Sequence, residues 1–208
     1  MTTRFAAAAL AAVLAGAAAA PVLTIPSAAS AQARNASAEQ FVQTEAQQVL
    51  RVLNDNRMSM AQKKAQFRRF VDQVADVPRI TRFVLGKYAR TVTPQQFSTF
   101  SAAFREYANQ VYESRLSSYR GEGFRVTGSQ ARSPTDVVVN SQVVGGSNNR
   151  KATVVWRVQR GADGRWRVVD VNVAGVWLAI TQQQDFVSTL DNNRGDINVL
   201  IAQLQGRA

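Results

Sequence analysis

The spacing of apolar residues changes once along the chain, near Gly121 and Gly123, and this change restricts the fold more than any other feature. Before these glycines, apolar residues recur every three or four positions, which is typical of amphipathic helices. The clearest run is Phe97, Phe100, Phe104, Tyr107 and Val111. After the glycines, valines alternate with polar residues, which is typical of strands with one buried face. Helices followed by short strands predict an α+β fold, with N-terminal helices packed on one face of an antiparallel sheet.

Start and turn signals divide the two halves into elements. Three capping boxes and one capping aspartate predict four helix starts. These starts are at Ser37, Ser59, Asp76 and Thr93. Turn residues separate four predicted strands, which makes an antiparallel meander. The turns are at 133–136, 145–149 and 161–164, and short closing helices are expected around 186–190 and 197–204. The apolar positions change from even to odd numbers between Val168 and Val169, which predicts a β-bulge there.

The composition excludes several classes of chemistry. The chain has no cysteine and no histidine, so thiolate metal sites, disulfides and His-based catalytic triads are all excluded. No metal or other cofactor is therefore expected. Lys and Arg number 25 against 14 Asp and Glu, a net charge of +11, which on its own would suggest a nucleic-acid partner.

The N-terminus indicates a different environment for this basic chain. Arg4 precedes a long Ala-rich run, and Ala31-Gln32-Ala33 forms an A-x-A cleavage site, so residues 1–33 are predicted to be a cleaved secretory signal peptide. Residues 34–208 then form one exported domain, expected in the periplasm as a monomer. There it meets anionic lipid head groups and no nucleic acid.

Asp170 is the only acidic residue inside a predicted strand, and it has two interpretations. A carboxylate held inside an apolar cone could act as a general base, as in small cone-shaped enzymes. Alternatively, Asp170 lies on the outer face of the sheet, near Arg165 and Arg167 or at the bulge. We favour the second interpretation, because serines without histidine and scattered acids offer no other catalytic set, and we predict that the chain is not an enzyme.

Two segments resemble a known family. The first runs from Val84 to Arg90 and on through Thr93-Pro94-Gln95-Gln96 to Tyr119, and the second from Val169 to Val176, Phe186 and 195–204. They are similar to the toluene-tolerance, MlaC-type periplasmic phospholipid-binding proteins. The resemblance implies helices over a curved four-stranded sheet, with an apolar cavity between them.

The resemblance also implies a function and partners. It implies a lipid carrier that shuttles phospholipid between an outer-membrane lipoprotein complex and an inner-membrane ABC transporter complex and so maintains outer-membrane lipid asymmetry. One branch of the family is linked to hopanoid lipids, which remains an alternative cargo. Trp177 and Gln183 depart from the family pattern, and Trp177 could alter the mouth of the cavity.

Spacing alone would make the apolar stripes an ordinary core, whereas the resemblance implies that they also line the cavity. The expected lipid-contacting residues are Leu85, Tyr88, Phe97, Phe100, Phe104, Tyr107, Val154, Trp156, Val171, Val173, Val176 and Leu178. Four basic residues are expected to contact partner complexes in preference to the lipid head group: Arg79, Arg82, Lys87 and Arg90.

Overall fold

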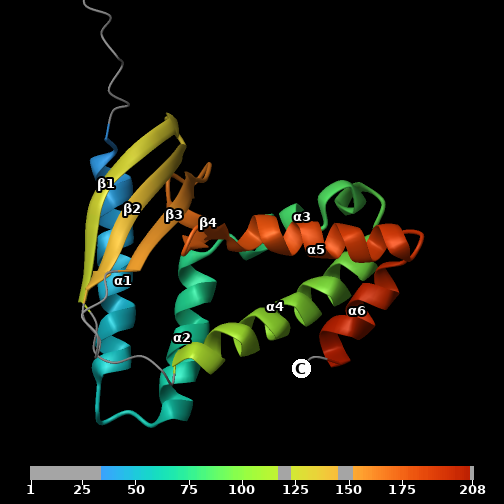
Figure 1. Ribbon diagram of the computed structural model, residues 1–208, viewed down its shortest axis with the longest axis horizontal. Helices are drawn as coiled ribbons and strands as arrows, with labels where there is room; N and C mark the ends of the chain where they lie inside the picture. Colours follow the sequence, from blue (N-terminus) through green and yellow to red (C-terminus); the bar gives the residue numbers. More distant parts are fainter. Residues whose placement is uncertain (1–33, 117–122, 145–151, 207–208) are drawn as a thin grey trace, which may run out of the picture. The chain divides into compact units, whose positions relative to one another are not determined.

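The computed structural model describes residues 34–116, 123–144 and 152–206 (Figure 1). The helices are α1 (Ala36–Asn54), α2 (Met60–Val74), α3 (Val77–Val84), the 3-10 helix η1 (Gly86–Arg90), α4 (Pro94–Leu116), α5 (Leu178–Asn192) and α6 (Ile197–Gly206). The strands are β1 (Gly123–Ser133), β2 (Asp136–Val144), β3 (Ala152–Arg160), β4 (Trp166–Val173) and β5 (Val176–Trp177). The predicted α+β class is confirmed. The predicted signal peptide and the hairpin loop at 145–149 lie outside the described residues.

Three of the four predicted helix starts are confirmed by their capping bonds. At α2 the Gln62 N–H donates to Ser59 Oγ (3.2 Å) and the Ser59 N–H donates to Gln62 Oε1 (2.7 Å). Thr93 and Gln96 form the same reciprocal pair before α4, and Asp76 accepts from the first turn of α3.

No helix within the described ranges combines the length and apolar composition needed to cross a membrane.

The prediction that Ser37 caps α1 is wrong. The cap is Asn35, whose Oδ1 accepts from the Ala38 N–H (3.0 Å) and from the Ser37 hydroxyl (2.9 Å). The Asn35 N–H donates in turn to Ser129 Oγ on β1 (2.7 Å). Because this contact across 94 residues fixes the backbone at Asn35, the helix begins two residues earlier than the local pattern indicates.

The strands form one antiparallel sheet in the order β1-β2-β3-β4-β5. The prediction of four strands misses β5, a two-residue strand that pairs with the end of β4. Ala174 and Gly175 between them have φ angles of 52° and 90°. Two-residue hairpin turns with both φ values positive match the twist of the flanking strands, so the chain folds straight back after Val173.

The predicted bulge is confirmed and determines which valines of β4 share a face. Arg157 lies opposite Asp170 and Val158 lies opposite Val168, so Val169 is the extra residue. Without it, Val168 and Val171 would point to opposite sides of the sheet. Because residues directly opposite one another share a face, the register assigns Val168 and Val171 to the same side. We call this side, on which α1 packs, the inner face.

Two apolar clusters stabilise the described fold. The sheet cluster joins α1 to the inner face and has as its buried members Ala38, Val42, Val137, Val139, Val158 and Val168. The helix cluster joins α3, η1, α4, α5 and α6 and includes Val84, Leu85, Phe100, Ala103, Phe186, Leu190, Ile197, Leu200, Ile201 and Leu204. In Figure 1, α1 runs along the sheet, whereas α5 leads away from the end of the sheet toward α6. The apolar stripes of the sequence therefore supply two cores.

Candidate functional site

The inner face of the sheet is covered unevenly. Helix α1 packs mainly against β1 and β2, and α2 reaches β4. Along β4 the exposed fraction of the inner-face side chains rises toward the turn, because Val168 is 8% exposed, Val171 is half-buried and Val173 is 43% exposed. Val176, opposite Val173, is 48% exposed. The inner face therefore presents an apolar surface that opens toward the β4–β5 turn.

An apolar crevice lies between α1 and α2. Its volume is about 140 Å³. The apolar residues that line it are Val49, Val52, Leu53, Phe67 and Phe70. The C-terminal end of α2 leads directly to the sheet, because the Asp76 N–H donates to the Val168 carbonyl (2.9 Å). Helix α2 thus lines the crevice and is followed directly by a contact with β4 at the buried Val168.

Trp156 fixes the middle of the inner face by a polar link. Its indole Nε1–H donates to Ser141 Oγ (2.9 Å), and the Ser141 hydroxyl donates to the Val154 carbonyl (2.8 Å). The Trp156 ring also packs edge-on against Phe124, with 6.1 Å between ring centroids. Ser141 is fully buried, so these bonds satisfy a hydroxyl that would otherwise be costly in an apolar setting.

The structure divides the predicted lipid-contacting residues into two groups. Val154, Trp156, Val171 and Val173 lie on the inner face of the sheet, with Val176 beside them. Leu85, Tyr88, Phe97, Phe100, Phe104 and Tyr107 belong to the helix cluster. Leu178 is half-buried at the first position of α5. The two groups do not form one continuous wall among the described residues, since the first belongs to the sheet and the second to the helix cluster.

The helix group is packed as a solid core. Leu85 and Phe100 are fully buried. Phe100 stacks on Phe104 with 5.8 Å between ring centroids, and Phe186 of α5 meets both rings edge-on at 5.7 and 5.6 Å. Such edge-to-face and stacked pairs stabilise a fixed arrangement. The inner-face group is therefore the better candidate for contact with a bound molecule.

Asp170 lies on the outer face, as the non-catalytic interpretation expects. It is opposite Arg157 in the register, and its carboxylate accepts from the N–H groups of Val171 and Ala179 at 2.8 Å each. Burial raises the pKa of the Asp170 carboxyl above its ordinary value, although these backbone donors oppose the rise. Ala179 is in the first turn of α5, so Asp170 caps that helix from a neighbouring strand. This geometry does not support the general-base interpretation, which requires the carboxylate to face an apolar cavity.

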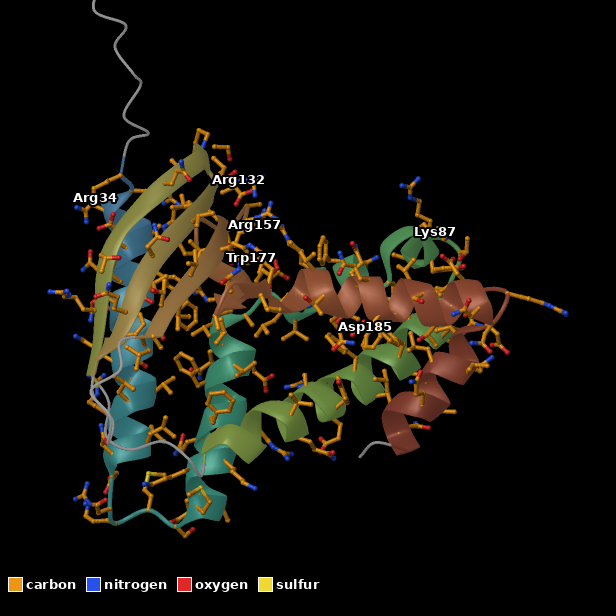
Figure 2. All side chains as sticks on the ribbon, viewed as in Figure 1. Arg34, Lys87, Arg132, Arg157, Trp177 and Asp185 are labelled. Carbon is orange, nitrogen blue, oxygen red and sulfur yellow. The ribbon has the colours of Figure 1, made fainter. Side chains whose placement is uncertain are left out.

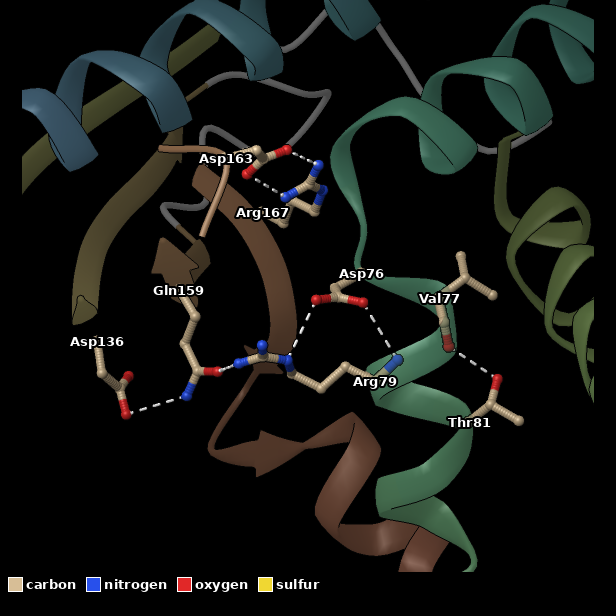
Figure 3. Close-up of polar contacts among 8 residues, drawn as sticks. All are labelled: Asp76, Val77, Arg79, Thr81, Asp136, Gln159, Asp163 and Arg167. Atoms are coloured by element: carbon tan, nitrogen blue, oxygen red, sulfur yellow. Dashed lines mark hydrogen bonds and ion pairs between the residues drawn. The ribbon is translucent and has the colours of Figure 1, made fainter. Parts of the chain in front are cut away.

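Three of the four predicted partner-contacting basic residues have partners within the chain. The Arg79 guanidinium binds Gln159 and pairs with Asp76 (3.1 Å; Figure 3). Arg82 lies 4.8 Å above the Phe97 ring.

Lys87 (Figure 2) pairs with Asp191 near the C-terminal end of α5 (2.7 Å), which raises the pKa of the Lys87 ammonium. Asp191 is thirteen residues along α5 from its start, a helix length of about 20 Å, whereas Arg79 contacts the sheet. Arg90 is exposed. The four cations therefore do not form one patch.

The two positions that depart from the family pattern have local roles. Trp177 lies opposite Asn172, on the outer face that also carries Arg157 (Figure 2). It therefore points to the opposite side of the sheet from Val173 and Val176. The Gln183 side-chain amide donates to the Phe83 carbonyl (2.6 Å) and so links α5 to the end of α3.

Comparison with known proteins identifies the family. The sequence model of the MlaC protein family matches residues 43–206. The chain belongs to the MlaC family. Its structure is similar to that of a phospholipid-binding protein from Ralstonia solanacearum, which was solved in complex with a phospholipid. The two share 26% sequence identity and a TM-score of 0.72, and the match covers 82% of this chain and 96% of that chain.

One part of the candidate site in this MlaC-family protein was not predicted from the sequence. The apolar stripes of α1 and α2 predict helices that each bury one face, but they do not predict that these helices face each other across a crevice. The available signal was the mixture of residues on α2, where phenylalanines at 67 and 70 adjoin Gln66, Arg69 and Gln73. An apolar stripe bordered by polar residues predicts that one face of a helix is buried, but it does not show which element covers that face.

Proposed function

We propose that this MlaC-family protein carries phospholipid in the periplasm, with the acyl chains held against the inner face of β3 and β4. The observation that carries the proposal is the partly exposed apolar surface of Val154, Trp156, Val171 and Val173. The apolar crevice between α1 and α2 supports it. The phospholipid complex of the Ralstonia solanacearum protein supports the same cargo class.

Holding acyl chains out of water requires an apolar surface of this kind but does not require a reactive group. Each methylene removed from water contributes about 0.8 kcal/mol, so a diacyl lipid is almost insoluble without a carrier. The crevice of about 140 Å³ is smaller than the roughly 300–1,000 Å³ of ordinary ligand pockets. Helices α1 and α2 must therefore separate when a lipid enters. A non-catalytic carrier agrees with the structural role of Asp170.

The remaining parts of the proposal concern the route. We propose that residues 1–33 direct export and are removed after Ala33, and that the protein then exchanges lipid with an outer-membrane lipoprotein complex and an inner-membrane ABC transporter complex. This exchange would maintain the lipid asymmetry of the outer membrane. Exposed cations, Arg82 and Arg90 among them, would speed and orient docking, since surface charge acts mainly on encounter.

Three charge substitutions, two on the inner face and one on the outer face of the sheet, test the lipid surface. Val171→Glu and the more exposed Val173→Glu place a carboxylate on the inner face, whereas Val155→Glu places one on the outer face, opposite Asn172. An unpaired charge is costly among acyl chains, so both inner-face variants should lose lipid when the purified proteins are mixed with vesicles. Val155→Glu should load normally, and thermal unfolding confirms that each variant folds. Folded inner-face variants that load as the wild type does would exclude this surface.

A further inference from the structure

Polar side chains surround the apolar interior of the crevice between α1 and α2. Four polar residues line its edge: Gln48 on α1, and Gln66, Arg69 and Gln73 on α2. Among the described residues, none of these four side chains has a hydrogen bond or an ion pair. By contrast, Arg68 pairs with Glu106, and Asp72 pairs with Arg105. The crevice therefore combines an apolar interior with hydrogen-bond donors that are not engaged by the fold.

This combination matches an amphiphile that has an anionic group at one end. A guanidinium binds a phosphate through two parallel N–H donors, and side-chain amides can donate to the remaining phosphate or ester oxygens. The apolar interior suits a hydrocarbon chain, because an apolar cavity of about 150 Å³ holds a molecule the size of benzene. At about 140 Å³ the crevice thus accepts a short stretch of acyl chain before the helices move.

Glu45 helps to determine at which end of the crevice a phosphate would lie. It lies on the same side of α1 as Phe41, one turn before it, and Val49, one turn after it. Phe41 packs on the sheet cluster and Val49 lines the crevice, so Glu45 stands between the two. It is half-buried without a hydrogen bond or ion pair among the described residues, and burial raises its pKa. A carboxylate there repels a phosphate, while Arg69 at the edge attracts one.

We propose that the crevice between α1 and α2 is the portal of the lipid site, where Arg69 and the three glutamines hold the phosphate while the acyl chains pass inward toward β4. The proposal rests on the proposed function. It assigns head-group recognition to α2 and leaves the basic residues of α3 and η1 to contacts with partner complexes. The chemical class of ligand is a phosphodiester with two acyl chains.

A lipid pair that differs only in the phosphate tests the portal. Lipid-free protein is mixed with vesicles that contain either phosphatidylglycerol or diacylglycerol with the same chains, and retained lipid is measured after gel filtration. Arg69→Glu should retain phosphatidylglycerol about tenfold more weakly, which corresponds to about 1.4 kcal/mol, and retain diacylglycerol as the wild type does. Lys64→Glu is the matched control, because it makes the same charge change on α2 outside the crevice lining. It should alter neither lipid.

Three outcomes overturn the portal. Unchanged retention of phosphatidylglycerol by Arg69→Glu shows that the guanidinium does not hold the phosphate. An equal loss of both lipids shows that the substitution damages the helix pair and not a head-group site. An equal effect of Lys64→Glu shows that only overall charge matters. Failure of the wild-type protein to retain either lipid contradicts carriage itself, which separates the failure of the proposed function from that of the portal.

Discussion

Replacing Asp170 with alanine should uncap α5 and destabilise the fold without touching the inner face. The carboxylate accepts from the Ala179 N–H and the Val171 N–H, both at 2.8 Å, and Asp170 is only 7% exposed. Loss of a helix cap costs about 0.5–2 kcal/mol, and a buried donor left without an acceptor costs about 1–3 kcal/mol. Together, Asp170→Ala should lower the free energy of unfolding by about 2–4 kcal/mol.

Asparagine at the same position separates capping from charge. Asp170→Asn keeps an oxygen that can accept from Ala179, and it removes a charge whose burial is unfavourable, as the raised pKa of the carboxyl indicates. Its stability should therefore lie within about 1 kcal/mol of the wild type. For a domain of this size, the alanine variant should lose about 5–15 °C in melting temperature. The measurement is urea and thermal unfolding of lipid-free protein, with lipid loading of Asp170→Asn as a second readout.

The reasoning would be refuted by an alanine variant as stable as the wild type, because the two backbone donors would then not depend on the carboxylate. Equal destabilisation by asparagine and alanine would assign the effect to the negative charge beside Arg157. An Asp170→Asn variant that is fully stable but fails to load lipid would assign Asp170 a role in the site and would reopen a chemical function for it.

Two further predictions concern pH and docking. Burial raises the pKa of Glu45, so the folded state favours its protonated form, and this contribution to stability is complete below about pH 4.5 and is lost as pH rises through the folded pKa. Glu45→Gln should therefore be more stable than the wild type at pH 7 and equally stable near pH 4. Equal urea midpoints of the two proteins at both pH values would contradict the burial of Glu45. The double variant Arg82→Glu with Arg90→Glu should load lipid normally but transfer it more slowly to the membrane complexes at low salt. The control double variant, Arg51→Glu with Lys64→Glu, makes the same charge change and should transfer lipid at the wild-type rate. Identical transfer rates for the two double variants would show that Arg82 and Arg90 serve only solubility.

Local signals in the sequence were sufficient where a bond joins neighbouring residues. The capping pairs at Ser59 and Thr93 and the bulge at Val169 were predicted because each depends on a few adjacent positions. The start of α1 was missed because Asn35 is held by Ser129, which is distant in sequence. The strand β5 was missed because alanine at position 174 does not signal a positive φ as glycine or asparagine would.

For the candidate site, the sequence indicates which faces of the helices and strands are apolar but not which elements pack together. Periodicity identified the apolar stripe of α4, but it could not show that Phe100 and Phe104 pack against Phe186 and not against the sheet. The register places Val171 and Val173 on one face of the sheet with Val154 and Trp156, and their contact with lipid stays a prediction. The crevice was not predicted, since the partner of an amphipathic helix depends on how the helices pack together.

Identification of the bound lipid tests the central claim most directly. The protein is produced with its N-terminal segment in a bacterial envelope, purified without detergent and extracted with organic solvent, and the extract is analysed by mass spectrometry. The carrier account predicts phospholipid in an amount close to one molecule per protein chain, with much less from Val173→Glu purified in the same way. Recovery of no lipid from folded wild-type protein would contradict carriage, and recovery of a hopanoid in place of phospholipid would contradict the proposed cargo.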